Sequence, residues 1–126
     1  MPTSVKDLMA AAHAAVPAIS PADAAKLVAD NDALIVDVRD GTEVAASGKA
    51  KGAVAVSRGM LEFRADPESA AHDPAFRKDR TIILYCASGG RSALAGNTLV
   101  DMGFKDVRNL GGFKDWVSAG CEVEPA

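Results

Sequence analysis

The residues best suited to chemistry lie in one short loop, Cys86-Ala87-Ser88-Gly89-Gly90-Arg91-Ser92. The loop follows an apolar run, Thr81–Tyr85, and precedes a stretch with helical periodicity, so the cysteine stands where a strand ends and a helix begins. The main-chain N–H groups at a helix N-terminus point outward and carry about half a positive charge. Such a site binds anions and lowers the pKa of a cysteine. The pattern therefore predicts a thiolate nucleophile, Cys86, in an anion-binding cup.

The rest of the loop is predicted to hold an anionic sulfur. Gly89 and Gly90 lack a Cβ atom and tolerate the unusual φ and ψ angles that turn several N–H groups inward. Ser92 is placed to cap the helix. Arg91 is expected to hold the anionic part of a substrate and to favour thiolate over thiol. The predicted substrate-binding residues are Ala87, Ser88, Gly89, Gly90, Arg91, Ser92 and, in an earlier loop, Arg58.

Other reactive or charged side chains are expected to have secondary or structural roles. Arg58 and Arg64 are placed to attract an anionic substrate, with a solvated surface position as the alternative. Asp37 and Arg39 are expected to brace neighbouring loops. Cys121, near a turn after Gly120, is expected to be incidental.

Length and composition fit a single globular domain. The 126 residues are 48 % apolar and 25 % charged, with a formal net charge of −3. An acidic balance without a basic patch predicts no nucleic-acid partner. No apolar run approaches the ~20 residues of a membrane span, and the N-terminal stretch lacks a signal-peptide pattern. We therefore expect a cytoplasmic protein that does not bind membranes.

Cysteine and histidine usage gives no sign of a metal or a disulfide framework. Cys86 and Cys121 are the only two cysteines, which is too few for such a framework. His13 and His72 show no ligand spacing with either cysteine. The sequence therefore predicts no metal site and no cofactor.

Periodicity predicts alternating helices and strands. The predicted strands cover residues 33–38, 53–56, 81–85 and 106–110. The predicted helices cover residues 5–16, a segment capped by Ser20 and begun by Pro21, residues 92–102, and a segment after Gly112. A helical turn over 43–46 and short helices around Leu61 and after Pro74 also fit the pattern. Strands separated by helices imply βαβ units and a mostly parallel sheet.

Four motifs, spread over roughly residues 18–120, resemble a known family in kind and order. They are Asp37-Val38-Arg39-Asp40 with Glu43, Gly52-Ala53-Val54, the loop 86–92, and Asn109-Leu110-Gly111-Gly112-Phe113 followed by Trp116. Together they resemble a single-domain rhodanese, a sulfurtransferase. Many relatives have Gly-His-Ile where this chain has Gly48-Lys49-Ala50, and that histidine is usually read as structural. Residues 1–17 are expected to be an added N-terminal helix, and residues 18–126 the domain itself.

The resemblance implies an α/β fold and a two-step reaction. The fold would be a rhodanese-like, mostly parallel five-stranded sheet with helices on both faces, and the active cysteine would follow a central strand. The Cys86 thiolate would attack the outer sulfur of a small anionic donor such as thiosulfate, releasing sulfite. The persulfide would then pass its sulfur to cyanide, a small thiol or a protein thiol. Fixed N–H donors would stabilise the anionic sulfur, so no neighbouring base is required.

Two other functions remain open. One is a non-catalytic rhodanese-like interaction or regulatory module, although such modules often lack the cysteine that is present here. The other is a small cysteine phosphatase or arsenate reductase, whose loops have the spacing Cys-x5-Arg. Only four residues separate Cys86 from Arg91, and the shorter loop favours a cup sized for one sulfur atom.

Overall fold

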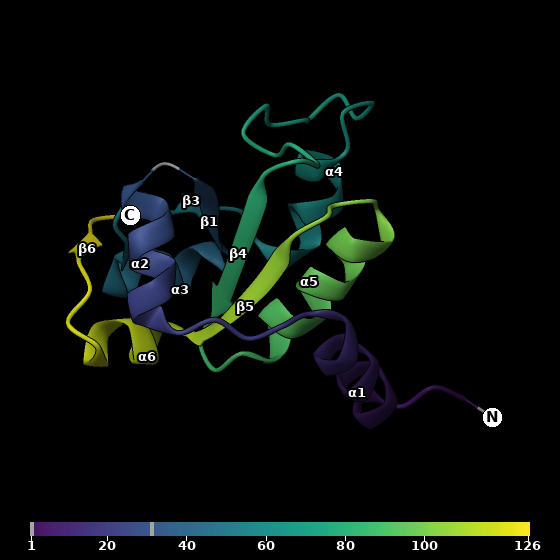
Figure 1. Cartoon of the computed structure of the whole chain (residues 1–126), viewed down its shortest axis with the longest axis horizontal. Coiled ribbons are helices and arrows are strands. Elements are labelled where there is room, and N and C mark those ends of the chain that lie inside the picture. Colours follow the sequence, from purple (N-terminus) through teal and green to yellow (C-terminus); the bar gives the residue numbers. More distant parts are fainter. Residues whose placement is uncertain (1, 31) are drawn as a thin grey trace.

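A four-stranded parallel sheet forms the centre of the molecule in a computed structural model, which describes residues 2–30 and 32–126. The strand order is β3-β1-β4-β5 (Figure 1), which confirms the α/β class and the mostly parallel sheet. The bounds of these strands are Val54–Ala55 for β3, Ala33–Asp37 for β1, Thr81–Cys86 for β4 and Val107–Gly112 for β5. A separate antiparallel pair joins β2, Lys49–Ala50, to β6, Val123–Glu124.

The fifth strand implied by the family resemblance is reduced to a single bridge. Ala18 pairs in parallel with Asn109 at the outer edge of β5. The N–H of Asn109 donates to the carbonyl oxygen of Pro17 at 2.9 Å, and the N–H of Ile19 donates to that of Asn109 at 3.1 Å. Pro17 has no N–H to donate, so the pairing does not extend back toward α1, and in the other direction α2 begins at Pro21. The segment that follows the first helix is nevertheless tied to the sheet beside β5.

Six α-helices and one 3-10 turn complete the described part of the chain. Their bounds are Val5–Ala15 (α1), Pro21–Ala29 (α2), Gly41–Ser47 (α3), Arg58–Met60 (η1), Leu61–Ala65 (α4), Gly90–Asp101 (α5) and Phe113–Ser118 (α6). The predicted helix around Leu61 is confirmed, whereas the one after Pro74 is wrong because that segment forms turns. None of the helices described here is long and apolar enough to cross a membrane.

Local signals set the ends of the main helices as predicted. The Ser20 hydroxyl accepts the N–H of Asp23 at 3.1 Å, and Pro21 is the first residue of α2. At the far end of α5, Gly103 has φ +97° and the N–H of Phe104 donates to the carbonyl oxygen of Leu99 at 3.1 Å. These contacts satisfy main-chain groups that the helices leave without partners.

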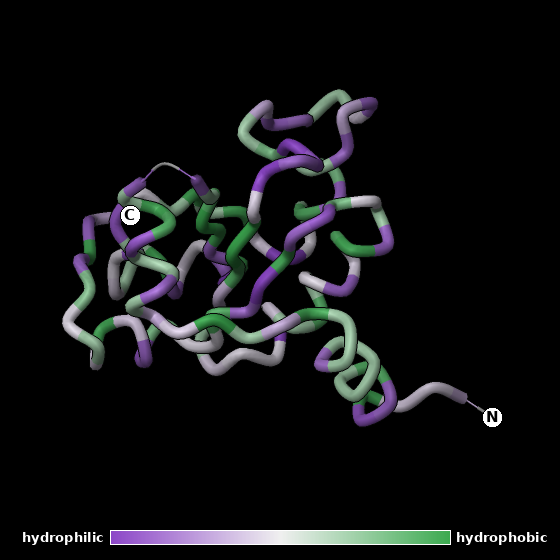
Figure 2. The backbone as a smooth tube through the Cα atoms, viewed as in Figure 1, coloured by the Kyte–Doolittle hydropathy of each residue, from purple (hydrophilic) through white to green (hydrophobic). Residues whose placement is uncertain are grey.

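Alternation along β4 divides the core into two layers. Ile82, Leu84 and Cys86 share one buried cluster with residues of α4 and α5. Ile83 and Tyr85 point to the other cluster, which includes residues of α2 and α6. Figure 2 shows hydrophobic residues concentrated on β1 and β4, between the helical layers. Because side chains alternate along a strand, the cysteine that ends β4 faces the same layer as α5.

Helix α1 lies at one side of the molecule and packs mainly against α5 (Figure 1). Its predicted apolar face is buried only toward its C-terminal end, at Ala12 and just beyond the helix at Val16. Val5 and Leu8 are 70 % and 45 % exposed. Gly96 permits the close packing, because a Cβ there would lie 3.0 Å from both methyl groups of Val16.

A buried ion pair ties the end of β1 to the neighbouring elements. The Arg39 guanidinium donates to the Asp37 carboxylate at 2.7 Å, and the Tyr85 hydroxyl donates to the same carboxylate at 2.7 Å. Asp37 is 0 % and Arg39 5 % exposed. The guanidinium also lies 4.3 Å from the centre of the Phe113 ring. Asp37 and Arg39 therefore have the bracing role that the sequence predicts.

Candidate active site

Cys86 occupies the junction between the last residue of β4 and the loop that starts α5. Its side chain is only 1 % exposed. The main-chain N–H of Gly89 donates to Sγ at 3.0 Å, and the Ser92 hydroxyl oxygen lies 3.5 Å from Sγ. Gly89 has φ +104°, a conformation that other residues rarely adopt. Gly89 thus has the unusual conformation that the sequence predicts, and its N–H points at the sulfur.

The environment of Cys86 favours the thiolate. Burial raises the pKa of the Cys86 thiol, but the Ser92 hydroxyl and the main-chain N–H groups of Ser92, Gly89 and Ser88 lower it. The net effect is a pKa below the ordinary value of 9.0. Hydrogen-bond donors thus outweigh desolvation, as expected for a reactive rather than a purely structural cysteine.

Two conformational predictions for the loop are wrong. Ser92 does not cap α5; Gly89 is the N-cap residue, and no side chain caps it. Ser92 is instead buried with its hydroxyl near Sγ. Gly90 is the first helical residue and has no positive φ, so a single glycine, Gly89, accounts for the reversal of the loop.

Arg91 is held by a carboxylate from the first turn of α3, the helix that follows β1. Its guanidinium donates two hydrogen bonds to Glu43, at 2.7 and 2.9 Å. The Arg91 hydrogen bond, with a further one from the N–H of Asp40, lowers the pKa of Glu43 to about 2. The pair is about one-third exposed, so the guanidinium is within reach of solvent while being oriented by Glu43. An anionic donor would share Arg91 with this carboxylate.

The Glu43–Arg91 pair predicts a specific dependence of stability on pH. The pKa of Glu43 is lower in the folded chain than its ordinary 4.5, so its contribution is present above pH 4.5 and is lost as the pH falls toward about 2. Because the pair is partly exposed, we expect at most about 1 kcal/mol. Urea unfolding should show wild type more stable than Glu43→Gln at pH 7, with the difference vanishing near pH 2. A difference that is constant with pH would contradict this account.

Gly112, at the end of β5, packs directly against the main chain of the loop. A Cβ at Gly112 would lie 2.4 Å from the carbonyl oxygen of Ala87 and 3.3 Å from the Cα of Ser88. Ala87 and Ser88 are themselves exposed. Gly112 at the end of β5 therefore lets the loop lie directly against the sheet, and this contact places Cys86 relative to α5.

Replacing Gly112 by alanine should displace the loop. The clash is with main chain, which cannot rotate away, so we expect a loss of about 1–3 kcal/mol in unfolding free energy and slower reaction of Cys86. Gly41→Ala is the matched control, because a Cβ there meets nothing within 4 Å. Chemical denaturation and the rate of Cys86 alkylation measure the two effects. Equal values for the two variants would show that the close approach does not matter.

The remaining predicted residues lie farther from the sulfur. Arg58 donates to Glu62 at 2.9 Å and to Thr98 on α5 at 3.1 Å. Arg64 is exposed on α4. Both cysteines are free thiols, and Cys121 lies 3.8 Å from the carbonyl oxygen of Pro21. The structure therefore places Arg58 against α5, and within the described part of the chain no hydrogen bond joins its side chain to the loop.

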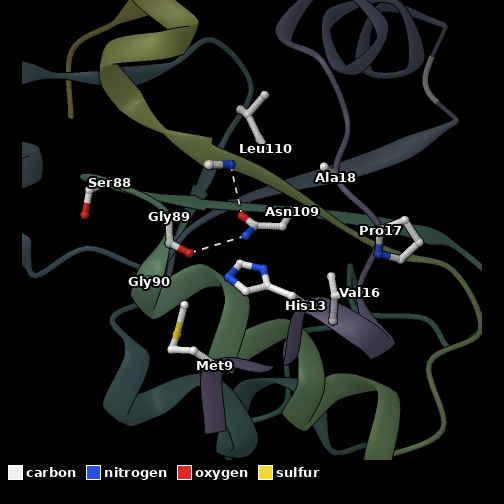
Figure 3. A pocket seen from close by; sticks show the side chains of 11 residues that line it. Met9, His13, Val16, Pro17, Ala18, Ser88, Gly89, Gly90, Asn109 and Leu110 are labelled. Atoms are coloured by element: carbon white, nitrogen blue, oxygen red, sulfur yellow. Dashed lines mark hydrogen bonds between the residues drawn. The ribbon is translucent and has the colours of Figure 1, made fainter. Parts of the chain in front are cut away.

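Asn109 belongs to one of the four motifs, but the sequence alone assigned it no role at the site. Its side-chain oxygen accepts from the Ser92 hydroxyl at 2.8 Å, and its amide nitrogen donates to the carbonyl oxygen of Gly89 at 3.3 Å. The available signal was the motif Asn109-Leu110-Gly111-Gly112, in which a polar side chain precedes two glycines by one residue. Figure 3 shows Asn109 beside a groove between α1 and the loop, with His13 pointing into it. The volume of this groove is about 410 Å³.

Comparison with known families agrees with this geometry. A family model described as the rhodanese-like domain matches residues 20–119, which is most of the chain. The chain belongs to the rhodanese-like family. Within this rhodanese-like domain, Cys86 has the position of the active cysteine that the resemblance implied. The matched range begins after α1, which ends at Ala15.

Two curated relatives are similar in sequence to this rhodanese-like chain. A sulfurtransferase of Allochromatium vinosum is 30 % identical over 99 residues, covering 78 % of this chain and 84 % of that protein. A tRNA uridine(34) hydroxylase of Nitrobacter winogradskyi is 34 % identical over 94 residues, covering 75 % of this chain. The chain spans only 36 % of that hydroxylase, about a third of its length. The shared part of the hydroxylase is thus one portion of a larger protein.

Two solved structures resemble nearly the whole rhodanese-like chain, α1 included. A Rhodopseudomonas palustris protein of unknown function, described as a possible tyrosine phosphatase, has a TM-score of 0.87 and 40 % identity, covering 98 % of this chain and 99 % of that one. The polysulfide-sulfur transferase homodimer of Wolinella succinogenes has a TM-score of 0.76 and 34 % identity, covering 96 % and 87 %. An enzyme of the sulfurtransferase kind is therefore supported by the family and its members.

Proposed function

We propose that the protein moves sulfane sulfur from a small anionic donor, such as thiosulfate, to a thiophilic acceptor through a persulfide on Cys86. The observation that carries the proposal is the main-chain N–H of Gly89, which donates to Sγ at 3.0 Å. A fixed donor of this kind stabilises negative charge on sulfur without rearrangement during the reaction. The lowered pKa of Cys86 supports the same reading.

The first step loads the cysteine. The Cys86 thiolate attacks the outer sulfur of thiosulfate, and a new S–S bond forms as the old one breaks. The electron pair of the broken bond leaves with sulfite, so no proton transfer is needed. The negative charge that develops during attack lies beside the N–H of Gly89 and the hydroxyl of Ser92, where it is stabilised.

The second step returns the enzyme to its thiolate form. Cyanide or a thiolate attacks the outer sulfur of the persulfide, and the bond between that sulfur and Sγ breaks. The leaving group is the Cys86 thiolate, which is a good leaving group because its pKa is lowered. A small thiol and a protein thiol are both included among the proposed acceptors. The name of the Wolinella relative adds polysulfide to the donors that merit testing.

Arg91 and Arg58 complete the proposal as sites for the anionic part of the donor. Arg91 lies at the start of α5 with two hydrogen bonds to Glu43, and a donor would have to share that guanidinium. Arg58 can contribute only through its charge or after leaving Glu62 and Thr98. A cytoplasmic location belongs to the proposal, because a reducing compartment keeps the free thiol of Cys86 available.

The main rival is a cysteine phosphatase, the activity suggested in the description of the Rhodopseudomonas relative. The four-residue separation between Cys86 and Arg91 argues against a cup for a tetrahedral oxyanion. Purified protein should be assayed with thiosulfate, mercaptopyruvate and polysulfide, each with cyanide or a thiol, and separately with an aryl phosphate. We expect product from at least one sulfur donor and no phosphate release.

Each rival predicts a different pattern in the same assays. Aryl phosphate hydrolysis that is lost in Cys86→Ser, without sulfur transfer, would assign the protein as a phosphatase. A specific protein partner that remains bound to Cys86→Ala, without any persulfide on the wild type, would assign a non-catalytic module. Sulfur transfer that depends on Cys86 would support the proposed function over both.

A further inference from the structure

The side chain of Asn109 lies between the sheet and the loop that surrounds Cys86. Three hydrogen bonds hold it there (two are drawn in Figure 3): its oxygen accepts from the N–H of Gly111 at 2.9 Å and from the Ser92 hydroxyl at 2.8 Å, and its nitrogen donates to the carbonyl oxygen of Gly89 at 3.3 Å. The main-chain N–H of Gly111 can only donate, so it fixes which end of the amide is oxygen. The opposite end must then donate to Gly89.

Both groups that Asn109 holds are in contact with the reactive sulfur. Gly89 donates its N–H to Sγ, and the Ser92 hydroxyl lies 3.5 Å from Sγ. Ser92 has one hydroxyl proton but three acceptors within reach: Asn109 Oδ1, the carbonyl oxygen of Gly89 at 3.2 Å, and Sγ. The shortest of these contacts is to Asn109. Asn109 therefore competes with Cys86 for the Ser92 proton.

The main chain of Asn109 is fixed independently of the loop. Its N–H and carbonyl oxygen pair with Pro17 and Ile19 in the segment that follows α1, and on its other side β5 pairs with β4. The amide thus has a rigid base, which a group that orients others requires.

We propose that Asn109 is a positioning residue for the reaction at Cys86, acting through Gly89 and Ser92. With Cys86 as a thiol, the S–H donates to the Ser92 oxygen, and the Ser92 proton goes to Asn109. With Cys86 as a thiolate, the Ser92 hydroxyl turns to Sγ, while Asn109 keeps the N–H of Gly111 and the carbonyl of Gly89. A neutral acceptor releases the proton to the anion, whereas a carboxylate would retain it. The inference deepens the proposed function and rests on it.

Replacing the amide by a carboxylate separates positioning from mere support. Asn109→Asp keeps the size and the acceptor oxygen, but it cannot donate to Gly89 and it adds a negative charge near the thiolate. The pH midpoint of Cys86 alkylation should rise by about one pH unit, which makes alkylation about ten-fold slower below both midpoints. Asn97→Asp is the matched control on α5, because no hydrogen bond of its side chain is present among the described residues.

Peptide mapping after iodoacetamide treatment gives the rate for each cysteine. Cys121 serves as an internal reference, since it lies beside Pro21 rather than the loop. The other charged or titratable groups around the loop are Arg91 with its partner Glu43, and His13 on α1, which lines the groove beside Gly89 and Asn109. These three residues are unchanged in every variant. Alkylation needs no sulfur donor, so its outcome does not depend on whether the proposed transfer occurs.

An unchanged pH midpoint of Cys86 alkylation in Asn109→Asp would overturn the inference, even if alkylation were slower at every pH. If that variant fails to fold, an NMR pH titration of the wild-type protein tests the inference instead. The side-chain amide resonances of Asn109 should shift with the same midpoint as Cys86, while those of Asn97 stay constant. Asn109 resonances that do not respond to ionisation of Cys86 would equally overturn it.

Discussion

The variant Cys86→Ser is expected to lose sulfur transfer by several orders of magnitude and to keep its fold. A hydroxyl at this position is protonated at neutral pH, and hydrogen bonds from Gly89 and Ser92 cannot lower its pKa enough to produce an alkoxide. The side chain is nearly the same size, so the buried cluster that contains Cys86 stays filled. Turnover with cyanide as acceptor, and thermal unfolding, measure the two parts of the expectation.

Cys121→Ser provides the matched control for this experiment. It makes the same chemical change at a partly buried thiol beside the carbonyl oxygen of Pro21, away from the loop. We expect wild-type turnover in that variant. Retained activity in Cys86→Ser, or loss of activity in Cys121→Ser alone, would move the chemistry away from Cys86.

Removing Arg39 should have the largest effect on stability. Arg39→Ala leaves the Asp37 carboxylate fully buried with the Tyr85 hydroxyl and one main-chain N–H as its remaining donors. Breaking a buried ion pair by removing one partner costs about 3–5 kcal/mol. Arg39→Ala also loses the stacking of the guanidinium over Phe113, which lies 4.3 Å away. Urea denaturation should show a correspondingly lower unfolding free energy.

The control is an ion pair at the surface whose partners, like Asp37 and Arg39, are two residues apart in the sequence. Arg108 donates to Asp106 at 2.9 Å, but the two side chains are 38 % and 41 % exposed. Arg108→Ala should cost no more than about 1 kcal/mol. Equal losses in the two variants would mean that burial does not determine the contribution of the Asp37–Arg39 pair.

Much of the fold could be predicted because its signals are local. Ser20-Pro21 starts a helix through a cap and a fixed φ angle, and Gly103 stops one through its left-handed conformation. The short, continuous apolar run 81–85 marked the central strand whose end carries Cys86. These features depend on neighbours in the chain, so the sequence reveals them directly.

The remaining contacts could not be predicted because their partners are distant in sequence. Glu43 and Arg91 are 48 residues apart, and Ser92 and Asn109 are 17 apart. Serine is a common helix-capping residue, so the sequence alone suggests that Ser92 is a cap. In the structure Ser92 lies inside the first turn of α5, and its hydroxyl lies between Sγ and Asn109. The two-residue strands β2 and β6 are too short to show any periodicity. Only the tertiary structure brings these residues together.

The most direct test of the account is the mass of the peptide that contains Cys86 after incubation with thiosulfate or polysulfide and removal of the excess donor. We expect an added mass of one sulfur atom, about 32 Da, on that peptide and none on the peptide that contains Cys121, because a bound persulfide requires the donors around Cys86. Cyanide should then remove the added mass. An unchanged mass, with the Cys86 thiol still free and open to alkylation, would contradict the central claim.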